Sequence, residues 1–170
     1  KIKNQRYLAV TQHKSARKVN LDSAMSLEIT LNTPLESQRY SSGMIEIAQF
    51  RIEEAADEFL RDLKELIRQS FGTKFSDDDW QHGLGGVHIA VRDSGILVSH
   101  AAIVPRRLYI GEKVFNGGYV ESVATLPDRQ YQGLGSMAMV EAGSVIANQF
   151  EIGALSSSSK DFYRKVGWED

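Results

Sequence analysis

The residues from Gln130 to Gly135, Gln-Tyr-Gln-Gly-Leu-Gly, have the composition of an anion-binding loop. They follow a strand-like run and precede a predicted helix, whose first backbone amides have no partner within the helix. Gly133 and Gly135 let a ligand come close to the backbone, and the amides of Leu134, Gly135 and Ser136 can donate to a pyrophosphate. The loop has neither the Gly-Lys-Ser/Thr of a Walker loop nor the Gly-x-Gly-x-x-Gly pattern. Taken alone, these residues fit a plain helix start better.

The histidines do not predict a metal site. His82 and His88 are six residues apart, which suits neither one helix face nor a zinc pair, and the chain has no cysteine. His13 lies in the N-terminal segment, and His100 lies in a predicted strand. We therefore expect no metal.

Two helix signals are clear before the glycine loop. From Glu53 to Ser70, apolar residues recur at steps of three and four and form one stripe, which is typical of an amphipathic helix. Ser76, followed three residues later by Asp79, predicts a capping box at the start of a second, short helix.

The remaining pattern alternates strands and helices. Pro105 is expected to interrupt one strand, which resumes after a bulge. The order of elements predicts a mixed α/β sheet, mostly antiparallel, with one parallel crossover after a central strand that ends before Pro127. The other predicted strands are 44–50, 87–92, 96–104, 106–110 and 152–155, and the other predicted helices are 136–150 and 160–166.

Composition predicts a single globular domain. With 170 residues, 42% apolar, the chain can bury a core without disulfides. It contains no run of eighteen apolar residues and no signal-peptide pattern, so we expect neither membrane insertion nor secretion, and a cytoplasmic location. Residues 44–170 carry thirteen Lys and Arg against nineteen Asp and Glu, which argues against a nucleic-acid partner and favours a cationic one.

The chain is expected to divide near Met44. Residues 1–43 are polar, with weak periodicity, and we expect an extension of uncertain structure in which 26–32 could form one short strand. Residues 44–170 form the predicted compact domain.

A strand, a Gln-x-x-Gly-x-Gly loop, a long helix and a short strand together resemble the acetyl-CoA-binding core of the GNAT superfamily of N-acetyltransferases. Four blocks are similar, more narrowly, to the aminoglycoside 2′-N-acetyltransferases, and the similarity covers roughly residues 45 to 168. The blocks are 75–88 with Trp-Gln-His-Gly-Leu-Gly-Gly, 118–121 with Gly-Tyr-Val-Glu, 153–158 with Gly-Ala-Leu-Ser-Ser-Ser, and 162–168 with Phe-Tyr and Gly-Trp.

The resemblance implies the GNAT fold, a mostly antiparallel sheet with a splayed central strand and flanking helices. It also implies that acetyl-CoA lies where the central strand leaves the strand Ile152–Leu155. Backbone groups of Val123 and Thr125 would bind the pantetheine. The pyrophosphate would lie on Gln130, Gln132, Gly133, Leu134, Gly135 and Ser136.

The resemblance also implies roles in proton transfer. Glu121 would accept a proton from the substrate ammonium through a water, and Tyr163 would protonate the departing thiolate. The alternatives are a solvated sheet face for Glu121, which shares its face with Tyr119, and a core position for Tyr163. From the residues alone, those alternatives are favoured.

Three residues are expected to contact the acceptor. The resemblance implies that Asp79 binds substrate amines, although Asp77, Asp78 and Asp79 by default stabilise a helix N-terminus. The Ser122 backbone and Ser156 are further contacts, and the alternative for Ser156 is a helix-capping loop. Lys74 opposes the binding of a cation, because the resemblance leads us to expect another acid at this position.

The predicted function is direct, acetyl-CoA-dependent transfer of an acetyl group to the 2′-amino group of aminoglycoside antibiotics, which confers resistance. Two alternatives remain open: a GNAT enzyme for another amine (a polyamine, metabolite or peptide) and a non-catalytic CoA-binding module. We expect a C-terminally truncated domain, because the family continues past the Gly-Trp block with residues that line the aminoglycoside pocket. Family analogy suggests a homodimer.

Overall fold

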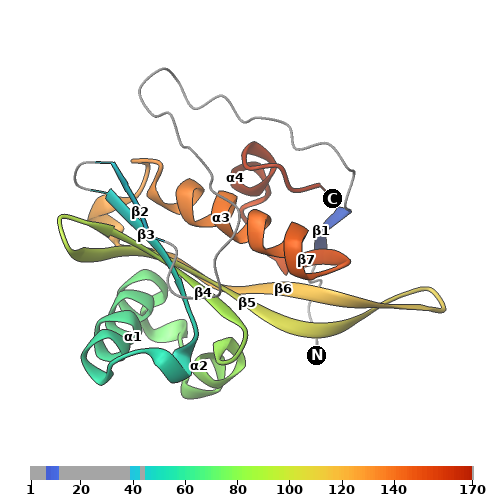
Figure 1. Ribbon diagram of the computed structural model, residues 1–170, viewed down its shortest axis with the longest axis horizontal. Coiled ribbons are helices and arrows are strands. Elements are labelled where there is room, and N and C mark those ends of the chain that lie inside the picture. The colour runs from blue at the N-terminus through green and yellow to red at the C-terminus, as the bar shows by residue number, and fades with distance from the viewer. Residues whose placement is uncertain (1–6, 12–38, 43–44, 170) are drawn as a thin grey trace.

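The computed structural model describes residues 7–11, 39–42 and 45–169, and in this part of the chain seven strands form one sheet (Figure 1). The strands are β1 (Tyr7–Thr11), β2 (Arg39–Ser42), β3 (Ile45–Phe50), β4 (Val87–Asp93), β5 (Ile96–Ile110), β6 (Lys113–Thr125) and β7 (Ile152–Ser156). The α-helices are α1 (Asp57–Phe71), α2 (Asp77–Gly83), α3 (Leu134–Gln149) and α4 (Lys160–Lys165). Three short 3-10 helices are η1 (Ile52–Glu54), η2 (Gly72–Lys74) and η3 (Pro127–Arg129).

The sheet has the order β1-β7-β6-β5-β4-β3-β2. All neighbouring strands are antiparallel except β6 and β7, which are parallel and are connected by α3. The predicted mixed sheet with one parallel crossover after the central strand is therefore confirmed.

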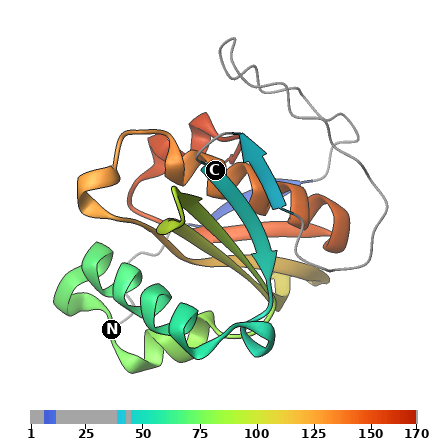
Figure 2. The ribbon, with the colours of Figure 1, turned by 60° about the vertical axis from the view of Figure 1, so that its left-hand side comes forward.

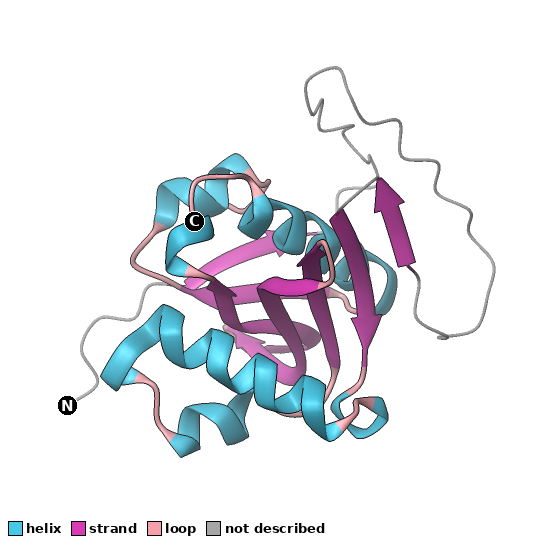
Figure 3. Cartoon of the chain, turned by 90° about the vertical axis from the view of Figure 1, so that its left-hand side faces the viewer, coloured by secondary structure: helices cyan, strands magenta, loops and turns pink. Residues whose placement is uncertain are grey.

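Helices cover both faces of the sheet, with α1 and α2 on one face and α3 and α4 on the other (Figures 2 and 3). Under α1, the predicted stripe buries Leu63, Leu66 and Ile67 against the sheet. Under α3, a larger apolar layer includes Met139 and Ile103. No helix in the described ranges has the length and apolar character needed to cross a membrane.

The strands β6 and β7 separate part of the way along their length. Their pairing joins residues 117–120 to residues 152–155 and ends at Val120 and Leu155. Beyond that point β6 runs on to Thr125, and among the described residues it has no partner on the β7 side. The two strands therefore form a wedge whose open edge presents backbone groups of β6.

The other edge of β6 carries a β-bulge at the same level. Glu121 pairs with Ala102 of β5 and Ala124 pairs with His100, so Ser122 and Val123 together oppose one residue. Ser122 has a φ of 53°, which is uncommon for a residue other than glycine. The bulge therefore lies on β6 at the point where the wedge opens, and this is the irregular part of the sheet.

The structure differs from the sequence prediction at Pro105. Strand β5 runs through this residue without a shift in register, and the bulges lie elsewhere, so the predicted interruption is wrong. β4 pairs with β5 only as far as Ile103, so Pro105 lies where one edge of β5 is already unpaired and a missing N–H costs little.

The ends of several other elements also differ. Helix α3 begins two residues earlier than predicted, at Leu134. β1 and β2, which pair with β7 and β3 at the two edges of the sheet, were not predicted. The possible strand at 26–32 lies outside the described residues.

Candidate active site

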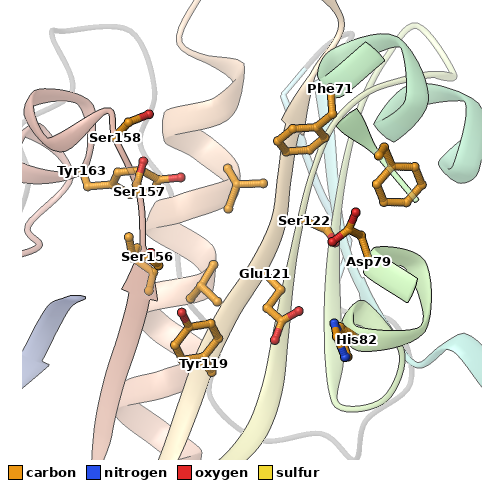
Figure 4. A pocket seen from close by; sticks show the side chains of 14 residues that line it. Phe71, Asp79, His82, Tyr119, Glu121, Ser122, Ser156, Ser157, Ser158 and Tyr163 are labelled. Carbon is orange, nitrogen blue, oxygen red and sulfur yellow. The ribbon is translucent and has the colours of Figure 1, made fainter. Parts of the chain in front are cut away.

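A cavity of about 530 Å³ opens where β6 and β7 separate (Figure 4). The end of α1 and helix α2 form one wall, β6 forms the base, and the end of β7 with α4 forms the opposite wall. The lining residues are Phe71, Phe75, Asp79, His82, Tyr119, Val120, Glu121, Ser122, Val123, Leu155, Ser156, Ser157, Ser158 and Tyr163.

Six of the residues predicted from the sequence line this cavity. They come from four elements or their ends, and Figure 4 shows Asp79 and Glu121 on one side and Ser156 and Tyr163 on the other. The six are Asp79, Glu121, Ser122, Val123, Ser156 and Tyr163. Thr125 ends β6, and the predicted pyrophosphate loop follows it, so these residues continue the open edge beyond the cavity.

Glu121 is held by an ion pair. Its Oε1 accepts a hydrogen bond from Nη2 of Arg106 at 3.2 Å, and the same Nη2 lies 3.1 Å from the carbonyl oxygen of His82 at the end of α2. The Glu121 side chain is 20% exposed. Arg106 thus ties β5 to α2 and fixes the carboxylate at the edge of the cavity.

Asp79 has a capping role as well as a position in the cavity wall. Its Oδ2 accepts hydrogen bonds from the amide of Ser76 at 2.9 Å and from the Ser76 hydroxyl at 2.7 Å, and the Ser76 hydroxyl accepts from the Asp79 amide. These bonds with Ser76 lower the pKa of Asp79. The predicted capping box is confirmed, and it keeps a charged carboxylate beside the cavity.

Tyr163 is 8% exposed, and it lines the cavity from α4. Burial raises the pKa of its phenol, and a hydrogen bond with the side chain of Ser157 opposes this shift. A phenol with a raised pKa remains protonated at neutral pH and can donate a proton. Tyr163 also belongs to the apolar core, as expected from the residues alone, and its role as a general acid stays a prediction.

The start of α3 fits an anionic ligand. Gly133 is the N-cap residue with a φ of 83°, and no side chain caps the helix, so the amides of Leu134, Gly135 and Ser136 have no side-chain partner at the cap. A Cβ on Gly135 would lie 3.0 Å from Oγ1 of Thr125, which explains a glycine where the helix passes the end of β6.

The side chains of the two loop glutamines contact the loop itself. Nε2 of Gln130 donates to the carbonyl of Thr125 at 3.4 Å, and Nε2 of Gln132 donates to the carbonyl of Asp128 at 3.3 Å. Arg129 donates to Oε1 of Gln132 at 3.0 Å and forms an ion pair with Asp93, which lowers the pKa of Asp93. The loop is therefore shaped by its own polar contacts and anchored to the end of β4.

Two buried histidines lie behind the bulge. His88 and His100 are 2% and 1% exposed, with Nδ1 of His88 3.0 Å from Nε2 of His100. Nδ1 of His100 lies 2.9 Å from the carbonyl oxygen of Ser122. Burial lowers the pKa of His88 to about 4 and that of His100 to about 3, so both are neutral at pH 7. The described residues contain no group of three or more His, Asp or Glu placed to hold a metal ion.

Several residues of the site were missed from the sequence. Arg106 and the histidine pair act through contacts across strands, for which no local signal exists. Phe75 and His82 lie inside the block around Asp79 and could have been inferred from it. The side chain of Lys74 is not among the described ones, so its predicted effect on cation binding is untested.

Comparison with protein families gives one match over most of the chain. A family model described as acetyltransferase (GNAT) domain matches residues 51–170. The aminoglycoside 2′-N-acetyltransferase of Mycolicibacterium fortuitum is 37% identical over 107 residues, which cover 62% of this chain and 55% of that protein. The chain thus spans about half the length of this relative.

Solved structures share the fold. A GCN5-related N-acetyltransferase from Anabaena variabilis superposes with a TM-score of 0.59 at 19% identity, covering 70% of this chain and 31% of that one. AAC(6′)-Iy, solved in complex with the bisubstrate analogue CoA-S-monomethyl-acetylneamine, gives a TM-score of 0.59 at 16% identity, covering 74% of this chain and 91% of that one. At these identities the likeness shows the acetyltransferase fold.

The buried histidines predict that the fold loses stability in mild acid. Their pKa values in the folded chain, about 4 and about 3, lie below the ordinary value of 6.5, so the unfolded chain binds more protons as the pH falls below 6.5. The backbone of Gly85 and the charge of Glu53, both near His88, offset only part of the lowering of the His88 pKa. Stability should therefore be complete above pH 6.5 and fall toward pH 4, by at most about 1.4 kcal/mol per pH unit for each histidine.

Urea unfolding between pH 7 and pH 5 measures this effect. The loss of unfolding free energy per pH unit should be smaller in His88→Asn than in the wild type. It should be unchanged in His82→Ala, because the imidazole of His82 is exposed. A free energy of unfolding that is flat over this range in the wild type contradicts the neutral histidine pair.

Proposed function

Because this chain belongs to the GNAT acetyltransferase family, we propose that it transfers the acetyl group of acetyl-CoA directly to the 2′-amino group of an aminoglycoside. The observation that carries the proposal is one cavity, at the point where β6 leaves β7, that contains both Glu121 and Tyr163. The choice of the 2′-amino group is supported by the 37% identity to a relative named for that activity.

The open edge of β6 and the start of α3 fit acetyl-CoA. Backbone groups of Val123 and Thr125 would pair with the pantetheine amides, as an added strand would. The uncapped amides of Leu134, Gly135 and Ser136 would bind the pyrophosphate. A neighbour of the same fold was solved with a CoA-containing analogue, which supports this choice of ligand.

Proton transfer would need the two side chains in the cavity. Glu121 would take a proton from the substrate ammonium through a water, and the free amine would attack the thioester carbonyl to form a C–N bond. As the C–S bond breaks, Tyr163 would protonate the thiolate. The amine would then lose its second proton to solvent, Glu121 would release its proton to solvent and Tyr163 would take one up from it, leaving an amide and free CoA. Positioning of the two substrates would supply much of the rate.

The charges near the cavity suit a cationic acceptor. The carboxylates of Asp79 and Glu121 both lie in its lining, and Asp79 has a lowered pKa. Aminoglycosides carry several ammonium groups, which would bind at such a site. The Ser122 backbone and Ser156 would supply further polar contacts. Acetylation would inactivate the antibiotic in the cytoplasm and so confer resistance.

Acetyl transfer to a panel of acceptors tests this function. Release of CoA thiol should occur with tobramycin and gentamicin, which carry a 2′-amino group, and not with kanamycin A, which has a 2′-hydroxyl and a 6′-amino group. Transfer to polyamines or peptides alone contradicts the aminoglycoside acceptor, and transfer to kanamycin A contradicts the 2′ position. Binding of acetyl-CoA with no transfer to any amine indicates a non-catalytic module.

Glu121→Gln should lower kcat by about 10²–10⁴, which is the usual contribution of a general base. The amide keeps the shape of the side chain but cannot accept the proton. The matched control is Glu112→Gln in the turn between β5 and β6, where the carboxylate is exposed and far along the hairpin from the cavity. Equal rates in the two variants would exclude Glu121 as the base.

Gly135→Ala should raise the KM for acetyl-CoA about tenfold, equivalent to about 1.4 kcal/mol. The added Cβ would lie 3.0 Å from Oγ1 of Thr125 and push the loop away from β6. The control is Gly143→Ala on the same helix, where a Cβ meets no atom within 4 Å. If Gly135→Ala binds acetyl-CoA as the wild type does, the pyrophosphate is not held there.

A further inference from the structure

The peptide between Ser122 and Val123 lies outside the ladders of the sheet. Neither residue has a register partner on β5, and the pairing of β6 with β7 has ended two residues earlier, at Val120. Ser122 also holds a left-handed φ of 53°, which is a strained conformation for a residue other than glycine. A strained peptide outside the paired register depends more than its neighbours on other groups to fix its orientation.

His100 is one such group. Its ring is 1% exposed, and its Nδ1 lies 2.9 Å from the Ser122 carbonyl oxygen. A carbonyl oxygen only accepts, so Nδ1 of the neutral ring carries the proton and Nε2 is an acceptor. Nδ1 of His88, 3.0 Å from that Nε2, must then be the donor. The contacts therefore define one protonation pattern for the pair.

This pattern leaves one nitrogen over. Nε2 of His88 is buried and makes no well-aligned hydrogen bond in the described part of the chain, and the nearby Gly85 backbone offsets only part of the lowering of the His88 pKa. In the inferred pattern it is an unprotonated acceptor, and an unpaired buried acceptor is still a cost. A pair of buried imidazoles with one unpaired ring nitrogen stabilises a core poorly, which indicates that the pair has a role other than packing.

The direction of the Ser122 carbonyl fixes the amide on the other side of the same peptide. In a planar trans peptide the C=O and the next N–H point in opposite directions. His100 holds the Ser122 carbonyl toward the core, so the Val123 N–H points away from the core, and Val123 lines the cavity. Ser99, beside His100, donates to the carbonyl of Ala124 at 2.8 Å and so fixes the next residue of β6 as well.

We propose that His100, supported by His88, is a positioning residue that holds the Ser122–Val123 peptide so that the Val123 N–H is aimed at the thioester carbonyl of acetyl-CoA. The proposal rests on the proposed function, since it assigns that amide to the oxygen on which charge develops during acetyl transfer. A donor already aimed at this oxygen stabilises the transition state without reorganising, and one such donor is worth about 10²–10³ in kcat.

The direct readout is the carbonyl stretch of bound acetyl-CoA labelled with carbon-13 at the acetyl carbonyl, measured by infrared difference spectroscopy. A hydrogen bond from Val123 shifts this band to lower frequency than in solution. In His100→Leu the band should return toward its solution position, while His100→Asn, which keeps an N–H near the place of Nδ1, should restore much of the shift. This measurement needs no acceptor.

A matched control separates positioning from stability. Met139→Ala empties a buried site under α3, on the other face of the sheet, and should lower the free energy of unfolding without moving the band. With a competent acceptor, His100→Leu should lower kcat about tenfold to a hundredfold, less than the cost of deleting an oxyanion donor. Its KM for acetyl-CoA should stay within about threefold of the wild type, a change below about 0.7 kcal/mol.

A second measurement uses only the wild type and holds even if His100→Leu does not fold. Long-range ¹H–¹⁵N spectra should show both His88 and His100 as neutral rings protonated on Nδ1. A ring of His100 protonated on Nε2, or a cationic ring at pH 7, overturns the proposal.

The outcomes separate the two claims. If the carbonyl band of acetyl-CoA bound to His100→Leu has the same frequency as in the wild type, the positioning role is overturned and the proposed function is left intact. A normal band shift in a wild type that acetylates no aminoglycoside supports the positioning role and contradicts the acceptor. Failure of the wild type to bind acetyl-CoA overturns both.

Discussion

Parallel pairing between β6 and β7 stops at Val120 and Leu155, and the candidate site depends on that separation. If the pairing continued, the backbone of β6 would be satisfied by β7 and could not bind another extended molecule. Because it stops, the residues that follow Val120 face a cavity instead of a strand. The same separation lets side chains from α2, β6 and α4 meet around one space.

The open edge is kept in shape from its other side. The bulge at Ser122 and Val123 occurs on the β5 edge of β6, just after the pairing with β7 ends at Val120. Arg106 of β5 holds Glu121, and His100 of β5 holds the carbonyl of Ser122. Strand β5 therefore holds side chain and backbone groups of β6 in place, and β6 supplies residues that line the cavity.

Local signals in the sequence predicted much of the scaffold. The apolar stripe of α1, the Ser76–Asp79 capping box and the glycines before α3 are each encoded within a few residues, so each could be read without knowledge of the fold. The GNAT resemblance predicted which strand and helix would form a CoA site, and that location stays a prediction; the family match confirms the resemblance itself.

What the sequence did not reveal depends on register between strands. His88 and His100 meet because the β4–β5 hairpin pairs Ala90 with His100, and a shift of one residue would turn an imidazole to the other face. Arg106 reaches Glu121 for the same kind of reason, across the β5–β6 pairing. The edge strands β1 and β2 were missed because weakly periodic segments form strands only when a neighbouring strand supplies the hydrogen bonds.

The proposed binding of acetyl-CoA along the open edge of β6 and the start of α3 can be measured by amide chemical shifts during a titration with acetyl-CoA. The largest shifts are expected at Val123, Thr125 and residues 133–136, with those of α1 little changed. A second hollow of about 520 Å³ beside α1, lined by Phe59, Asp62 and Leu66, offers the alternative location. Saturable binding with the largest shifts in this second hollow, and none along β6, would show that acetyl-CoA does not bind along β6 and α3.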